Sequence, residues 1–199
     1  MSNLFDRLAR LFEASHHIGA LGLRDDSEFA PNERRPAAVL IAVTDRAEPG
    51  ILLTHRPESM ARHPGQIAFP GGKLEAGEDA VTAALREAEE ELGIDPACVR
   101  VIGTGQDFVT GSGFHLTPVL GVIPPDLPIR PDPREVADWF EAPLRFVFDP
   151  ANHVAKMGMF GPYERNFTEI TWEGHRIWGI TAGIIVNLSH RLSGQELVG

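Results

Sequence analysis

The chain has almost no cysteine, since Cys98 is the only one among 199 residues. One cysteine cannot form an intramolecular disulfide, and nothing in the cysteine content indicates an oxidising compartment. Long apolar runs are also missing, because no stretch reaches the roughly 20 residues that a membrane-spanning helix needs. These absences predict a soluble cytoplasmic protein that does not cross a membrane.

Positive charge is scarce as well. Lys and Arg number 18 against 28 Asp and Glu, and the formal net charge is −10. Because nonspecific nucleic-acid binding depends on basic surfaces, this balance argues against a nucleic-acid partner. The eight histidines include no pair at a recognised zinc spacing. An anionic substrate would need a bound metal ion and a few arginines to neutralise it locally.

The chain does contain enough apolar sequence for a substantial core. Its 199 residues are 43% hydrophobic, which predicts a single domain over residues 1–199. Near the start, leucines and a phenylalanine recur at helical spacing, so a short amphipathic helix is predicted over residues 3–14.

Apolar runs of strand length follow this helix. Residues 36–44 form one run and residues 51–54 another, with the turn-prone sequence Glu48-Pro49-Gly50 between them, which predicts a buried hairpin. The same criteria predict the remaining elements: strands at residues 99–108 and 115–123, an exposed proline-rich connection at 124–133, a short helix at 142–148, a hairpin of residues 167–172 and 176–178, and a closing helix at 181–192.

A central helix is predicted over residues 78–92, which are mostly strong helix formers, with Gly77 before them and Gly93 after them. Strands on both sides of this helix predict an α/β fold in which helices cover both faces of a mixed sheet. One apolar face, within about 60° of arc, is predicted to pack on the core: Val81, Leu85, Ala88 and Leu92.

Another face of this helix carries Glu87, Glu90 and Glu91 at positions i, i+3 and i+4. Like charges at this spacing repel each other, and a hard divalent cation such as Mg²⁺ or Mn²⁺ would relieve the repulsion. A solvated acidic face is the alternative interpretation. Small side chains on the same side are predicted to leave room for a bulky group: Ala80, Ala83 and Ala84.

The sequence Phe69-Pro70-Gly71-Gly72 lies just before the helix and predicts a sharp turn that brings the backbone close to the carboxylates. A backbone carbonyl of this turn, assigned to Gly72, is a further candidate oxygen ligand. Phe69 itself is expected in the core rather than stacked on an adenine ring.

The turn and helix together resemble the Nudix box, GX5EX7REUXEEXGU, where U is a bulky aliphatic residue. Ala88 is smaller than the usual U. The resemblance implies the Nudix α/β/α sandwich, a mixed β-sheet between α-helices. Every fixed position of the box is filled: Gly72, Glu78, Arg86, Glu87, Glu90, Glu91 and Gly93, with Ile94 as the last aliphatic residue.

The segment upstream of the box is similar to the signature of coenzyme A pyrophosphatases, LLTxR[SA]x3Rx3Gx3FPGG. Residues 52–56 read LLTHR and residues 65–72 read GQIAFPGG. Two positions depart from the signature, because Pro57 replaces Ser or Ala, and Ala61 replaces an arginine that occurs one residue later as Arg62. With later matching segments, the resemblance covers roughly residues 35–190.

Substrate-binding candidates follow from this signature. Arginine offers a planar fork of donors that suits phosphate oxygens, so Arg56 and Arg62 are expected to bind substrate, with solvated loop charges as the alternative. Gln66 would orient the substrate or cap the turn.

The resemblance also implies the catalytic roles. Glu87, Glu90, Glu91 and the Gly72 carbonyl would hold Mg²⁺ or Mn²⁺, and Arg86 would orient a neighbouring glutamate. The general base stays open: Glu90, Glu87 and Glu135 are all candidates, and Glu135 is equally interpretable as an exposed loop charge.

The implied activity is hydrolysis of the diphosphate of coenzyme A or its derivatives to 3',5'-ADP and 4'-phosphopantetheine or its acyl form. The alternative is a Nudix pyrophosphatase that acts on ADP-ribose, dinucleotides or damaged nucleoside triphosphates. A third hypothesis is a noncatalytic module that binds a nucleotide. The expected partner is a small nucleotide-diphosphate substrate, and a homodimer is left open.

Overall fold

The computed structural model describes residues 4–15, 30–59, 64–160 and 163–192. The candidate substrate-binding residue Arg62 lies outside these ranges, so its predicted role stays a prediction. No helix in the described ranges is long and apolar enough to cross a membrane.

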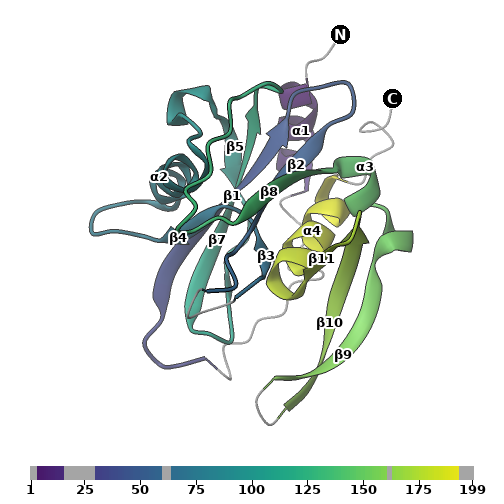
Figure 1. Ribbon diagram of the computed structural model, residues 1–199. Helices are drawn as coiled ribbons and strands as arrows, with labels where there is room; N and C mark the ends of the chain where they lie inside the picture. Colours follow the sequence, from purple (N-terminus) through teal and green to yellow (C-terminus); the bar gives the residue numbers. More distant parts are fainter. Residues whose placement is uncertain (1–3, 16–29, 60–63, 161–162, 193–199) are drawn as a thin grey trace.

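Eight strands form the main sheet, which is shown in Figure 1. They are β1 (Arg35–Thr44), β2 (Gly50–His55), β3 (Ile67–Ala68), β4 (Gly71–Lys73), β5 (Arg100–Thr104), β6 (Phe108–Val109), β7 (Phe114–Ile123) and β8 (Asp138–Pro143). The order is β3-β2-β1-β7-β5, with β4 paired to β1, β6 to β7 and β8 to β2. Strands β1 and β7 are parallel and their neighbours are antiparallel, so the sheet is mixed as predicted.

Different helices cover the two faces of this sheet (Figure 1). Helix α2 (Ala80–Leu92) packs on one face, where Leu40 of β1 joins its core cluster. Helices α1 (Leu4–Ala14) and α4 (Gly179–Leu192) pack on the other face, against a cluster that includes Ile41 of the same strand. Successive residues of β1 thus enter opposite cores, as the two-residue period of a strand requires. The predicted α/β architecture is confirmed.

A second sheet has the order β11-β10-β9 and extends away from the main body in Figure 1. It contains β9 (Val154–Phe160), β10 (Tyr163–Trp172) and β11 (His175–Trp178). The predicted hairpin corresponds to β10 and β11 and is confirmed, whereas β9 was not predicted.

Among the predicted elements, the strand at residues 99–108 and the helix at residues 142–148 have different boundaries in the structure. The strand expected over residues 99–108 is divided into β5 and β6, although the Gly105 amide between them still donates to the Pro118 carbonyl of β7 at 2.7 Å. The helix expected over residues 142–148 is shorter. Strand β8 occupies its first two residues, and Pro143 precedes α3 (Leu144–Val147) instead of lying in its first turn. Two 3-10 turns, Pro96–Cys98 and Pro150–Asn152, complete the described elements.

Candidate active site

Helix α2 begins at Ala80, two residues later than predicted, because Asp79 caps it. The Asp79 carboxylate accepts a hydrogen bond from the Thr82 amide at 2.7 Å. Such a cap stabilises a helix by about 1 kcal/mol. At the other end, Gly93 has a φ of 68°, which permits its amide to donate to the Glu89 carbonyl at 2.8 Å and ends the helix.

The buried face of α2 includes Ala88 and Leu92 as predicted but is rotated from the predicted one at its other residues. Val81 and Leu85 are only partly buried, whereas Ala83, Ala84 and Ala88 are completely buried against the sheet. The predicted space above the alanines is therefore absent at Ala83 and Ala84, because their small side chains serve close packing of the helix on the sheet.

This rotation places a carboxylate inside the protein. Glu91 continues the stripe of Ala84 and Ala88 at helical spacing and is only 3% exposed. Its carboxylate accepts a hydrogen bond from the Gly71 amide at 3.2 Å. Burial raises the pKa of Glu91 to about 8, although the charge of Arg56 acts to lower it. A charge on Glu91 therefore lacks sufficient compensation in this environment.

The double glycine before the helix is required by close approach of the backbone. Gly71 has a φ of 157°, and a side chain there would meet the backbone of Ala38 and Val39 on β1. A side chain at Gly72 would occupy the position of the Glu87 carboxylate. The predicted close approach to the carboxylates is confirmed, because the Gly72 backbone lies directly beside Glu87, but the chain bends only at Pro70 and the two glycines belong to strand β4 rather than to a sharp turn.

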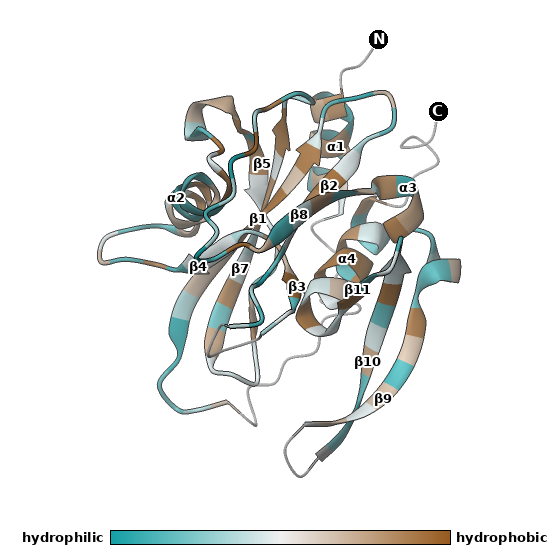
Figure 2. Cartoon of the chain, in the orientation of Figure 1, coloured by the Kyte–Doolittle hydropathy of each residue, from teal (hydrophilic) through white to brown (hydrophobic). Residues whose placement is uncertain are grey.

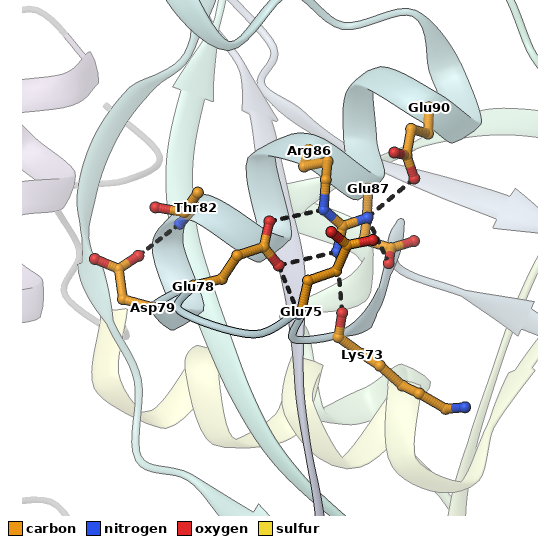
Figure 3. Close-up of polar contacts among 8 residues, drawn as sticks. All are labelled: Lys73, Glu75, Glu78, Asp79, Thr82, Arg86, Glu87 and Glu90. Carbon is orange, nitrogen blue, oxygen red and sulfur yellow. Dashed lines mark hydrogen bonds and ion pairs between the residues drawn. The ribbon is translucent and has the colours of Figure 1, made fainter.

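Arg86 holds the box together, as Figure 3 shows. Its Nε donates to Glu78 at 2.8 Å, and its Nη1 donates to Glu87 and to Glu90, each at 3.0 Å. Its Nη2 also donates to the Lys73 carbonyl at 3.0 Å. These bonds supply the geometry that the predicted orienting role of Arg86 requires. They also lower the pKa of Glu78, chiefly through its hydrogen bond to Arg86.

The donor set suits a hard divalent cation. Within the described ranges, no three His, Cys, Asp or Glu side chains are already arranged around one point, and the carboxylates of Glu87 and Glu90 both accept hydrogen bonds from Arg86. However, all the nearby donors are oxygens, and burial raises the pKa of both Glu87 and Glu91. Arg86 Nη1 uses one oxygen of Glu87 and one of Glu90, and a cation bound through the other carboxylate oxygens would compensate their charge, so the residues fit Mg²⁺ or Mn²⁺.

The connection after β7 brings Glu135 to the same site. The Asp132 amide donates to the Glu91 carbonyl at 2.9 Å, which fixes this connection on the end of α2. Although the Glu135 side chain is exposed, its charge contributes to the raised pKa of Glu87 and of Glu91. The candidate base is therefore within electrostatic range of the box.

Arg56 reaches the site from the end of β2. Its charge acts on Glu91, and its Nε is buried without a hydrogen-bond partner among the residues that the structure describes. The Arg56 amide donates to the Gln66 carbonyl at 3.0 Å, so the two predicted substrate-binding residues are neighbours. Phe69 is 4% exposed and belongs to the core cluster of α1 and α4, as predicted.

Two supporting contacts were missed by the sequence interpretation. A ring nitrogen of His55 lies 2.8 Å from the Gly65 carbonyl, and the Thr54 hydroxyl donates to the Ala68 carbonyl at 3.1 Å. Both contacts tie β2 to the segment that leads to the double glycine. Their position next to Arg56 was the available signal, but a loop contact of this kind has no characteristic spacing.

Known protein sequences are similar to this chain. A model of the NUDIX domain matches residues 33–158. The chain is 42% identical over 172 residues to a Shigella flexneri protein named Uncharacterized Nudix hydrolase NudL, a match that covers 84% of this chain and 88% of the relative. The Escherichia coli K12 protein of that name is 43% identical over 160 residues, which cover 78% of this chain and 81% of the relative.

A solved structure is also similar. The crystal structure of RenU, a Nudix hydrolase from M. smegmatis, superposes with a TM-score of 0.50 at 25% identity, and the match covers 59% of this chain and 75% of RenU. With the box intact, its glycines close to the carboxylates and these relatives matched over most of their length, the chain belongs to the Nudix hydrolase family.

Proposed function

We propose that this Nudix hydrolase cleaves the diphosphate of coenzyme A or its derivatives, giving 3',5'-ADP and 4'-phosphopantetheine or its acyl form. The observation that carries the proposal is Arg56, whose buried Nε has no partner in the described structure and whose charge acts on the box carboxylate Glu91. Arg56 belongs to the LLTHR sequence that resembles the coenzyme A signature.

The metal assignment rests on the oxygen donors of the box. Glu87, Glu90, Glu91 and the Gly72 carbonyl would hold Mg²⁺ or Mn²⁺, ions that Nudix enzymes use in general. When bound, such an ion neutralises diphosphate oxygens and lowers the pKa of a water molecule.

The protein's own residues then have distinct tasks. Arg86 fixes the side chains of Glu87 and Glu90 through its Nη1, so that both carboxylates are oriented before substrate arrives. Arg56 donates to phosphate oxygens, with Arg62 and Gln66 proposed to assist.

A carboxylate removes the proton of the attacking water, and Glu90, Glu87 and Glu135 are the candidates. Glu90 is 57% exposed and Glu135 is exposed as well, so either can reach a water molecule in front of the helix. Glu87 is half-buried and closer to the backbone of the double glycine. Separate Glu→Gln variants and their pH profiles of kcat distinguish the three, because loss of the base removes the acidic limb of the profile.

A second candidate substrate class is ADP-ribose, a dinucleotide or a damaged nucleoside triphosphate. Pro57 and Ala61 favour this alternative, because both depart from the coenzyme A signature. A noncatalytic module is disfavoured, since every carboxylate of the box is retained.

Mass spectrometry of the products separates these functions. The purified protein is incubated with Mg²⁺ and an equimolar mixture of coenzyme A, ADP-ribose, NADH and 8-oxo-dGTP, with Glu91→Gln as the inactive control. Dominant release of 3',5'-ADP and phosphopantetheine supports the proposal. Cleavage of only another compound in the mixture would move the assignment to the second class, and no product from any of them would favour the noncatalytic module.

We also propose a cytoplasmic location, which the nearly cysteine-free composition supports.

A further inference from the structure

Strand β9 exposes three large apolar side chains to solvent. Met157 is 63% exposed, Met159 is 67% exposed and Val154 is 47% exposed. The strand lies at the edge of the second sheet, where its described pairing is with β10 on one side. Figure 2 shows apolar segments along β9, in the part of the molecule that extends away from the main sheet. An exposed apolar edge strand is a template for pairing with another chain.

The two methionines continue the inner face of the second sheet. Met157 lies opposite Asn166 in the β9–β10 ladder, and alternation along β10 puts Asn166 on the same face as Ile170. Ile170 pairs with Ile177, and both are completely buried in the core cluster that includes α4. Beyond the buried core the opposed residues of β10 on this face are polar, namely Thr168, Asn166 and Glu164, so the exposed apolar side chains belong to β9 itself.

We propose that β9 pairs with β9 of a second copy of this chain, antiparallel about a two-fold axis. The two three-stranded sheets become one six-stranded sheet, and the methionine faces become continuous across the axis. The proposal does not depend on which diphosphate the enzyme hydrolyses.

The sequence of β9 selects one register for this pairing. A two-fold axis perpendicular to the sheet keeps each side chain on its own face, so the axis passes through a residue rather than between two residues. An axis at Met157 pairs all seven residues of Val154–Phe160 with the other copy. Lys156 then lies opposite Gly158, and Ala155 lies opposite Met159. An axis at Lys156 would instead place two like charges directly opposite each other, which is destabilising.

The strand also lacks the devices that prevent edge pairing. It contains no proline, and Lys156 is its only charged residue. In the selected register this lysine faces a glycine, so it does not block the second copy. This compatibility of the strand with itself favours a second copy over an unrelated partner as the occupant of the edge.

The interface defined by one strand pair is small, so the dimer is expected to dissociate on dilution. Interfaces below about 1,200 Å² belong to weak or transient complexes. A dissociation constant on the order of micromolar is expected, with ladder hydrogen bonds and methionine contacts as the attractive contributions.

Sedimentation velocity over a concentration series from about 0.1 to about 10 μM, roughly a hundredfold span around that expectation, tests the proposal. The wild type should shift from monomer to dimer, whereas Met157→Lys should stay monomeric because it places two cations on the axis. Ile180→Lys is the matched control, since it introduces the same charge at an exposed apolar residue of α4 and should dimerise like the wild type. Circular dichroism verifies that each variant is folded.

A charge-complementation experiment tests the register itself. Met157→Lys and Met157→Glu are each expected to be monomeric, but an equimolar mixture should give a heterodimer in native mass spectrometry, because residue 157 meets residue 157 of the other copy. A wild type that is monomeric at every concentration, a Met157→Lys variant that still dimerises, or a mixture without heterodimer would each overturn the proposal.

Discussion

The C-terminal end of α2 and strand β9 place opposite kinds of side chain in unfavourable surroundings. Glu91 on α2 is a carboxylate that is 3% exposed, whereas Met159 on β9 is an apolar side chain that is 67% exposed. Among the residues that the structure describes, Glu91 has no sufficient counter-charge and the apolar side chains of β9 have no covering surface. In both places the chemistry of the side chain does not match its surroundings, and such a mismatch is expected at functional sites.

The two regions need different binding partners to compensate for their surroundings. A buried carboxylate needs charge, which a cation supplies over a few ångströms, so its function depends on individual atoms. An exposed apolar strand needs area and backbone partners, so its function depends on several residues together. Mutations should therefore have large, localised effects at α2 and small, distributed effects at β9.

The largest effect is expected for Glu91→Gln. Loss of one ligand of the proposed metal site should lower kcat by a factor of about 10² or more, as is typical when one element of transition-state charge stabilisation is lost. Steady-state kinetics with saturating Mg²⁺ measures it. Glu89→Gln is the matched control, because the exposed neighbouring residue loses the same charge and should retain wild-type turnover. Equal turnover in both variants would remove Glu91 from the site.

Gly72→Ala should be the next most severe change. The added methyl group would collide with the Glu87 carboxylate, so the strand or the carboxylate has to shift. Because the clash is with the far end of a flexible side chain, the carboxylate moves at little cost in stability but leaves its position beside the backbone. The kcat should therefore decrease while urea unfolding changes little, whereas Gly105→Ala should change neither, since its methyl group would meet Pro118 at an ordinary 3.6 Å. Unchanged kcat in Gly72→Ala would contradict the close contact with Glu87.

A smaller effect is expected for Arg56→Gln, which removes a charge but not the metal ligands. Hydrogen bonds between charged groups are worth about 1.5–3 kcal/mol, so KM for the cleaved diphosphate should rise roughly tenfold to a hundredfold. The control is Arg145→Gln, because Arg145 is 66% exposed and paired with Glu48 on the surface. A wild-type KM in Arg56→Gln would remove this arginine from the substrate site.

The stability of the metal-free protein should depend on pH because the Glu91 carboxylate is buried. The folded-state pKa of Glu91, about 8, lies above the ordinary value of 4.5, so protonation favours the folded state. This contribution is complete below pH 4.5 and is lost as the pH rises through 8. In EDTA, Glu91→Gln should melt several degrees above the wild type at pH 9 and close to it at pH 4.5, since each kcal/mol shifts Tm by about 2–4 °C. Curves of Tm against pH that run parallel for the wild type and Glu91→Gln would contradict a buried charge at Glu91.

The smallest effect is expected at β9. Met159→Thr replaces an exposed apolar side chain with a good strand former, so the stability of the dilute monomer should change by less than about 0.5 kcal/mol. Urea unfolding at submicromolar protein measures this value. A loss of more than about 2 kcal/mol would show that Met159 is part of the core and that the comparison with α2 is wrong.

The box could be predicted from sequence because its spacing is a property of one helix and one turn. Glu87, Glu90 and Arg86 meet at helical spacing whatever surrounds them, and the double glycine before them is typical of a tight backbone approach. The predicted buried face of α2 was right for Ala88 and Leu92, but Val81 and Leu85 are only partly buried, whereas Ala83 and Ala84 are completely buried. Helix packing on this sheet selected the smallest side chains instead.

Tertiary contacts explain what sequence could not provide. Glu135 approaches the box only because the connection after β7 is bonded to the end of α2 and then to β2, where the Ala137 amide donates to the His55 carbonyl at 2.8 Å. Strands β8 and β9 were missed because each contains residues that are unfavourable in strands, such as Asp138 or Gly158. Their partners β2 and β10 complete the ladders.

Mn²⁺ binding followed by electron paramagnetic resonance tests the central claim most directly, because it measures the metal site without any assumption about substrate. Titration at pH 7.5 should show bound Mn²⁺ for the wild type and for Glu89→Gln, and binding at least roughly tenfold weaker for Glu91→Gln, as expected when one anionic ligand is lost. Equal Mn²⁺ affinity in all three proteins would contradict the assignment of the α2 carboxylates as the metal site.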